Sequence, residues 1–133
     1  MPDTYTVRLW RDNITAQTQL GRFDPERDTL VLDGIPRNLQ QAKILQDALD
    51  IVAVFNFICP DENQLAERLQ RRALRDNRLD DANLEVIKKR LAIFEKETKP
   101  ILDYYGPKLV HSIDSTQSPI NVLRDILRVL AKI

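Results

Sequence analysis

The stretch LVLDGIPRNLQQA, residues 30–42, decides the fold class predicted for this chain. It reads as a short apolar strand at 30–34, whose last two residues open the turn DGIPR at 33–37, followed by a helix over about 38–50. An apolar strand that leads directly into a helix is typical of an α/β protein with a parallel sheet.

The remaining sequence continues this alternation on both sides. The uncharged run IVAVFNFIC, residues 51–59, predicts the strongest strand, continuous enough to be buried on both faces. A third strand is predicted at 109–113. Further helices are predicted over about 3–20, 60–73, 82–97 and 119–132. Pro100 is expected to end or kink the helix before 102–105.

Composition narrows the possible functions. The 133 residues fit one domain, and 20 basic residues balance 20 acidic ones, so net charge indicates no partner. The only glycines are Gly21, Gly34 and Gly106, so no glycine-rich phosphate loop can be drawn from them. A single cysteine, Cys59, excludes an internal disulfide and a cysteine-based zinc site, and we expect it to be a buried thiol. No segment has the length of a membrane span or resembles a signal peptide, which favours a cytoplasmic protein.

Two predicted strands end in an acid, Asp33 and Asp114, where ligands of parallel sheets bind. Asp33 could hold a hydrated Mg²⁺, Gly34 allows close approach of the backbone, and Arg37 could grip a phosphate with two prongs. The alternative is an ordinary strand-to-helix turn with an Asp cap.

Arginines form a second pattern. Arg68, Arg71, Arg72 and Arg75 follow the i, i+3, i+4, i+7 spacing of one helix face, and Arg78 lies just beyond. Arginine suits phosphate recognition. The alternative is a solvated face that acids partly neutralise; these are Glu62, Glu67, Asp76 and Asp80. Zero net charge and the lack of interleaved aromatic residues argue against nucleic-acid binding.

A third pattern is Arg78-Leu79-Asp80-Asp81, with Lys88, Lys89 and Arg90 two to three turns later. The acids favour a helix start and could also orient Arg78 and Arg90. The alternative is plain helix capping beside a basic face.

As an ordered set, these features resemble the adenylate kinases. That family carries D-G-[FY]-P-R with a Gln four residues after the Arg, then an arginine-rich helix, then R-x-D-D, as this chain does in RLQRRALRDNRLDD. The ending TKPILDYYG resembles the family's T-x-P-x-x-x-Y-Y. The similarity runs from about residue 2 to the C-terminus. It implies a P-loop nucleoside-triphosphatase-like three-layer α/β fold, and reversible phosphoryl transfer from ATP to AMP with Mg²⁺.

The resemblance also implies residue roles. Arg37 would contact the phosphate of the nucleoside monophosphate and Gln41 its base. Arg72 and Arg78 would lie on either side of the phosphoryl group in transfer, and Asp33 would support Mg²⁺ through water. Residues on the AMP side would be Gly34, Arg37, Gln41, Arg78 and Arg90. Residues on the ATP side would be Arg68 near the base, Arg72, and the backbone near Gln117.

Departures from the family pattern qualify these roles. Ile35 replaces an aromatic residue, and one extra residue before Arg90 makes Lys89 its competitor for the monophosphate. The lid is a short loop at about 75–81, without the zinc site of longer lids. The family's base-reading positions fall mostly outside the match, so the base of the monophosphate is open.

The largest departure from the family pattern is at the N-terminus, because Met1-Pro2-Asp3 matches a point beyond the family's first strand and phosphate loop. That strand is the central one in the family, between those at 30–34 and 51–59 here. We therefore expect residues 1–133 to be a partial adenylate kinase core domain, truncated at the N-terminus and monomeric if complete. The alternative is a non-catalytic remnant that binds a nucleotide or a protein partner.

Overall fold

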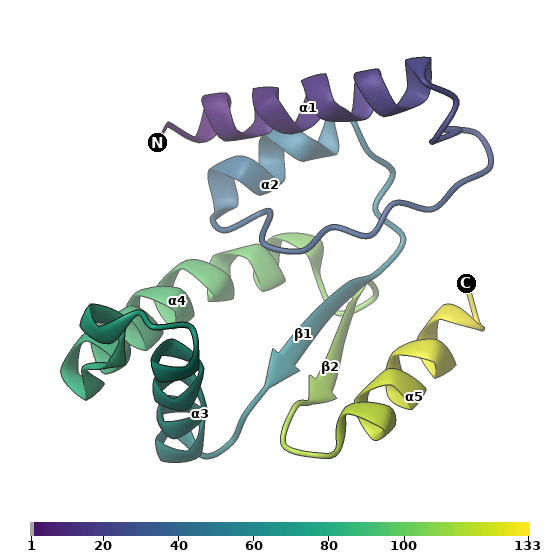
Figure 1. Cartoon of the computed structure of the whole chain (residues 1–133). Coiled ribbons are helices and arrows are strands. Elements are labelled where there is room, and N and C mark those ends of the chain that lie inside the picture. The colour runs from purple at the N-terminus through teal and green to yellow at the C-terminus, as the bar shows by residue number, and fades with distance from the viewer. Residues whose placement is uncertain (1) are drawn as a thin grey trace. The chain divides into compact units, whose positions relative to one another are not determined.

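The computed structural model describes residues 2–133 (Figure 1). The chain divides into two compact units, one ending at Asp50 and the other running from Ile51 to Ile133. Each unit has its own helices and buried side chains. The expectation of a single core domain with a short lid stays a prediction.

The first unit is a pair of helices, α1 (Asp3–Gln19) and α2 (Leu39–Gln46). Their contact buries Val7, Ala42 and Leu45 almost completely. Helix α1 confirms the helix expected over 3–20 and gives way to Gly21, whose φ of 66° suits glycine. Helix α2 is shorter than the expected 38–50, and a turn follows it.

The strand expected at 30–34 is wrong. These residues form no strand, and Val31 is 86% exposed. Backbone–backbone hydrogen bonds to residues 30–34 are absent from the described part of the chain. Apolar character favours an extended backbone here, but a strand also needs a neighbour to pair with its N–H and C=O groups.

The second unit is α/β and contains a parallel pair of strands, β1 (Val54–Ile58) and β2 (Val110–Asp114). The register runs from Val54 opposite Val110 to Ile58 opposite Asp114. Along the chain, β1 is followed by α3 (Glu62–Arg75), the 3₁₀ turn η1 (Leu79–Ala82) and α4 (Leu84–Tyr105), and then by β2. Helix α5 (Pro119–Leu130) follows β2 (Figure 1). This confirms the parallel strand–helix alternation. Among residues 2–133 the sheet has two strands rather than the three expected.

Strand β1 is less buried than its uncharged sequence predicts. Phe57 is 52% exposed, and Ile58 is also exposed. Cys59, expected to be buried, is only half-buried, and its Sγ donates a hydrogen bond to the carbonyl of Asp61 at 3.3 Å. In a two-stranded sheet each strand has one neighbour, so an apolar run fit for a central strand remains partly uncovered.

Helix α4 does not end at Pro100 but continues to Tyr105, and the alternative expectation of a kink at Pro100 stays a prediction. Proline removes one backbone donor but does not prevent a helix that tertiary packing stabilises. Ile87 and Ile101, one on each side of Pro100, are both buried. They lie fourteen residues apart, close to four full turns, so one buried stripe spans the proline.

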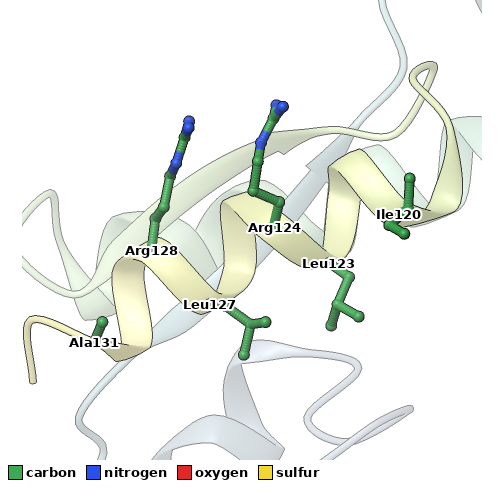
Figure 2. A pocket seen from close by; sticks show the side chains of 6 residues that line it. All are labelled: Ile120, Leu123, Arg124, Leu127, Arg128 and Ala131. Carbon is green, nitrogen blue, oxygen red and sulfur yellow. The ribbon is translucent and has the colours of Figure 1, made fainter.

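Helix α5 presents apolar side chains on two sides. It packs against β2, and Val122, Ile126 and Val129 are half-buried. Another side carries an open apolar groove of about 400 Å³, lined by Ile120, Leu123, Arg124, Leu127, Arg128 and Ala131 (Figure 2). Across residues 2–133, none of the helices combines the length and apolar character that crossing a bilayer requires.

Candidate functional site

In the first unit, the turn before α2 shapes the surroundings of Arg37. Gly34 has a φ of 81°, which side chains other than glycine rarely adopt. Its carbonyl accepts a hydrogen bond of 3.0 Å from Arg37 Nε. A Cβ on Gly34 would lie 3.8 Å from Arg37 Nη2, an ordinary contact, so backbone conformation rather than space requires glycine. The turn therefore holds one edge of the guanidinium and leaves this side chain exposed to solvent.

Gln41 is the buried polar centre of this unit, at 5% exposure. Its Oε1 accepts from the backbone N–H of Arg37 at 2.8 Å, and its Nε2 donates to Asp3 Oδ1 at 2.9 Å. Asn38 caps α2 by accepting from the Gln41 N–H, and its Nδ2 also donates to Asp3 Oδ1 at 2.9 Å. The side chain expected to read a base thus fixes Arg37 to α1 and α2, and the base contact stays a prediction.

The carboxylate of Asp3 ties the two helices together. Hydrogen bonds from Asn38, and then from Gln41, hold the pKa of Asp3 below its ordinary value of 3.8, because both donors stabilise the charged form. Sequence patterns did not reveal this contact, since Asp3 lies 35 residues before Asn38.

Asp33 is exposed and, within residues 2–133, its carboxylate has no hydrogen-bond or ion-pair partner. Magnesium in phosphate-transfer sites keeps several waters and uses few protein carboxylates, so one exposed carboxylate fits contact through water. Clusters of three or more His, Cys, Asp or Glu that could hold a metal do not occur among the described residues. The role of Asp33 toward Mg²⁺ stays a prediction.

In the second unit, Asp76 gathers arginines from the end of α3 and the loop after it. Its Oδ2 lies 3.1 Å from Arg78 Nη2 and 3.9 Å from Arg72 Nε. Its Oδ1 lies 3.5 Å from Arg75 Nε. Asn77, between Asp76 and Arg78, has a φ of 55° and turns the chain back. Arg72 and Arg78, expected on either side of a phosphoryl group, therefore share one carboxylate oxygen.

Asp81 extends this cluster to α4. Its Oδ1 lies 2.7 Å from Arg90 Nη2, and its Oδ2 lies 3.9 Å from Arg78 Nη1. The interpretation that the acids of R-L-D-D orient Arg78 and Arg90 is confirmed for Asp81. In the described chain Asp80 forms no ion pair, and neither does Lys89, the competitor of Arg90.

The arginine cluster, defined as Arg72, Arg75, Arg78 and Arg90 with Asp76 and Asp81, suits anion binding. Four cations meet two carboxylates, so two positive charges are left over. The side chains of Arg72, Arg78 and Arg90 are all more than half exposed. Arg71 points to a different partner, Glu67, at 3.9 Å. Each guanidinium of the cluster can donate several hydrogen bonds to anionic oxygens, and binding of a phosphate there stays a prediction.

Arg68 lies at the carboxyl ends of the two strands. Its Nη1 donates to the Ser115 carbonyl at 3.0 Å, and Ser115 donates to the Ile58 carbonyl through both N and Oγ, each at 2.9 Å. Gln117, two residues later, donates from Nε2 to Asp125 Oδ2 at 2.7 Å. This edge is where the sequence places the ATP base, and the assignment stays a prediction.

Asp114, the acid at the end of β2, is engaged in a local turn. Its Oδ1 accepts from Thr116 Oγ1 at 2.6 Å and Thr116 N at 2.8 Å. These bonds, the side-chain one first, lower the pKa of Asp114. The geometry therefore gives Asp114 a structural task at the edge where ligands bind.

Comparison with known proteins identifies the family. The sequence model of adenylate kinases matches residues 1–110. An adenylate kinase of Leptospira biflexa is 34% identical over 134 residues, covering 96% of this chain and 67% of its own length. One from Thermobifida fusca is 34% identical, covering 86% of this chain and 59% of its own length, and one from Synechococcus is 41% identical over 83 residues. The chain spans about two thirds or less of these relatives, and it belongs to the adenylate kinase family.

Proposed function

We propose that this chain supplies the phosphate-binding arginines of a nucleoside-monophosphate kinase that transfers a phosphoryl group reversibly between ATP and AMP. The observation that carries the proposal is the arginine cluster: Asp76 and Asp81 hold Arg72, Arg78 and Arg90 as one connected, exposed group. Membership of the family supports the same reaction.

Phosphoryl transfer needs positioning and charge neutralisation more than covalent help from the protein. In our proposal Arg72 and Arg78 neutralise charge on the group in transfer, while Arg90 and Arg37 hold the monophosphate. The exposed Nη atoms of Arg37 would bind the phosphate, because its Nε already donates to Gly34. Mg²⁺, when bound with ATP, supplies further neutralisation of the phosphates. Asp33 would then orient water molecules of its hydration shell.

The 133 residues contain no GxxxxGK[ST] sequence, whose backbone and Lys cradle the β- and γ-phosphates. Turnover therefore needs such a segment to be supplied, and the 133-residue chain by itself should not transfer phosphate. Under the second candidate function, a non-catalytic module, the same arginines bind a nucleotide that is released unchanged. A cytoplasmic location and a monomeric state are further parts of the proposal.

The test joins the phosphate-loop segment of the Leptospira biflexa relative to this chain and measures ATP-to-AMP transfer. Alanine at Arg37, Arg72 or Arg78 should lower kcat/KM strongly, on the order of a thousandfold for arginines that stabilise the transferring group. Lysine should rescue poorly because a point charge lacks the two-pronged geometry.

Arg71 provides the matched control, because it lies on α3 beside Arg72 but pairs with Glu67. Arg75 is a second control: it belongs to the arginine cluster through Asp76, but the family resemblance does not place it on a phosphate. Alanine at either should cost little activity. Losses at Arg71 and Arg75 as large as those at Arg72 and Arg78 would refute the assignment of individual residues and leave a diffuse basic surface. ATP binding by the fusion without any turnover would favour the non-catalytic module.

A further inference from the structure

Asp76 occupies a position that an anionic ligand would be expected to take. Its Oδ2 lies within 3.1 Å of Arg78 Nη2 and 3.9 Å of Arg72 Nε, the two side chains assigned to the phosphoryl group. Its other oxygen meets Arg75 Nε at 3.5 Å. One carboxylate therefore forms ion pairs with three guanidinium groups, whose positive charges would otherwise repel one another.

The helix itself does not favour an acid at this position. Asp76 is the C-cap of α3, and its backbone N–H donates to the carbonyls of Arg72 and Leu74 in the last turn. The C-terminal end of a helix carries partial negative charge, which disfavours a carboxylate. The favourable partners of Asp76 are thus the arginines.

These ion pairs are of a kind that a ligand can displace. The side chains of Arg72 and Arg75 are 67% and 77% exposed, and that of Asp76 is 36% exposed. The pair with Arg78 is shorter, at 3.1 Å, but the Arg78 side chain is also 52% exposed, so solvent screens all three pairs and each is individually weak. A polyphosphate brings more charge and more acceptor oxygens than one carboxylate.

We propose that Asp76 is a place-holder for phosphate. Its carboxylate forms ion pairs with Arg72 and Arg78 when no ligand is bound, and a polyphosphate displaces the carboxylate from both arginines when it binds. The inference rests on the proposed function for the identity of the anion. Asp76 is a positioning residue, since it acts through the arginines. Asp81 differs, because its short contact of 2.7 Å is to Arg90, and it reaches Arg78 only at 3.9 Å.

The test measures binding of inorganic tripolyphosphate to the 133-residue chain by titration calorimetry at low salt. Asp76→Asn removes the competing charge while keeping the size of the side chain, so we expect affinity to rise about threefold to tenfold. Asp76→Ser, a second neutral variant, should behave in the same way, and Asp76→Glu should remain near the wild-type affinity. Raising the salt concentration should shrink the difference.

Glu67→Gln is the matched control, because it removes one carboxylate from the same helix and releases Arg71. Its affinity should stay within about twofold of wild type, since Glu67 pairs with Arg71, which lies outside the cluster, and exposed pairs of this kind are weak. A purely structural role for Asp76 cannot produce a gain of affinity. Equal or weaker binding by both neutral variants would overturn the proposal, as would the absence of binding by wild type and variants alike. A gain of affinity at Asp76 alongside an inactive fusion protein would uphold the place-holder and reject the kinase assignment.

Discussion

The turn around Arg37 and the arginine cluster around Asp76 both present guanidinium groups, but different forces organise them. Arg37 is fixed through its backbone N–H and Nε by neutral groups, including the amide of the buried Gln41. The cluster is fixed by ion pairs between side chains that remain largely in solvent. The first arrangement is part of the fold of its unit, whereas the second can be rearranged at little cost in stability. Under the proposed function, the first arrangement would support one phosphate rigidly, and the second would supply adaptable charges for the group that is transferred.

Of the substitutions that test this comparison, Gln41→Leu should have the largest effect on stability. Leucine keeps the volume but leaves the carboxylate of Asp3 and the N–H of Arg37 without this partner, which we expect to cost about 1–3 kcal/mol of unfolding free energy. The chain's single tryptophan, Trp10 in α1, reports unfolding of this unit by fluorescence in denaturant. Gln40→Leu, at the exposed neighbouring position, is the control. Equal stability of the two variants would mean that the buried amide does not organise the turn.

Acid should weaken the first unit through Asp3. Its folded-state pKa lies below the ordinary value of 3.8, so the stabilisation is fully present above that value and is lost as pH falls through the lowered pKa. We expect a smaller effect than that of Gln41→Leu, because the carboxylate is accessible to water. Denaturant midpoints read by Trp10 between neutral pH and acid should fall less steeply in Asp3→Asn than in wild type. Parallel pH profiles would show that Asp3 titrates alike in the folded and unfolded chain.

The smallest effect on stability is expected in the arginine cluster. Arg90→Ala removes the 2.7 Å pair with Asp81, but the Arg90 side chain is 62% exposed, so the unfolding free energy should fall by no more than about 0.5–1 kcal/mol. Circular dichroism during denaturation can follow the second unit, which lacks a tryptophan. A loss as large as that of Gln41→Leu would show that the cluster is structural and would remove the contrast between the two regions.

The sequence predicted those elements whose signals are local. The apolar spacing in residues 3–20 predicted α1, and the uncharged run at 51–59 predicted β1, since both patterns are contained in the element itself. The strand expected at 30–34 did not form, because pairing depends on a neighbour that no local pattern supplies. Pro100 does not end α4, which continues to Tyr105 with Ile101 buried directly after the proline.

In the candidate site, too, local sequence signals were informative and contacts that depend on the three-dimensional fold were not. The R-L-D-D sequence indicated that Asp80 and Asp81 could orient Arg78 and Arg90; Asp81 pairs with both, whereas Asp80 forms no ion pair in the described chain. The sequence indicates only that Asp76 helps to neutralise the arginine face. Its three ion pairs depend on how the loop turns at Asn77, which no local pattern predicts. Asp3 was not foreseen as a partner of Gln41, since a contact across 38 residues has no local signature.

The apolar groove on α5 gives meaning to the dependence of the melting temperature on protein concentration. Ile120 is 75% exposed, and Leu123 and Leu127 are also exposed along the same groove. An association that covered these side chains in the folded state alone would link the apparent melting temperature to protein concentration by mass action. The proposed monomer should therefore melt at the same temperature at two protein concentrations, and a concentration-dependent value would contradict the monomeric state.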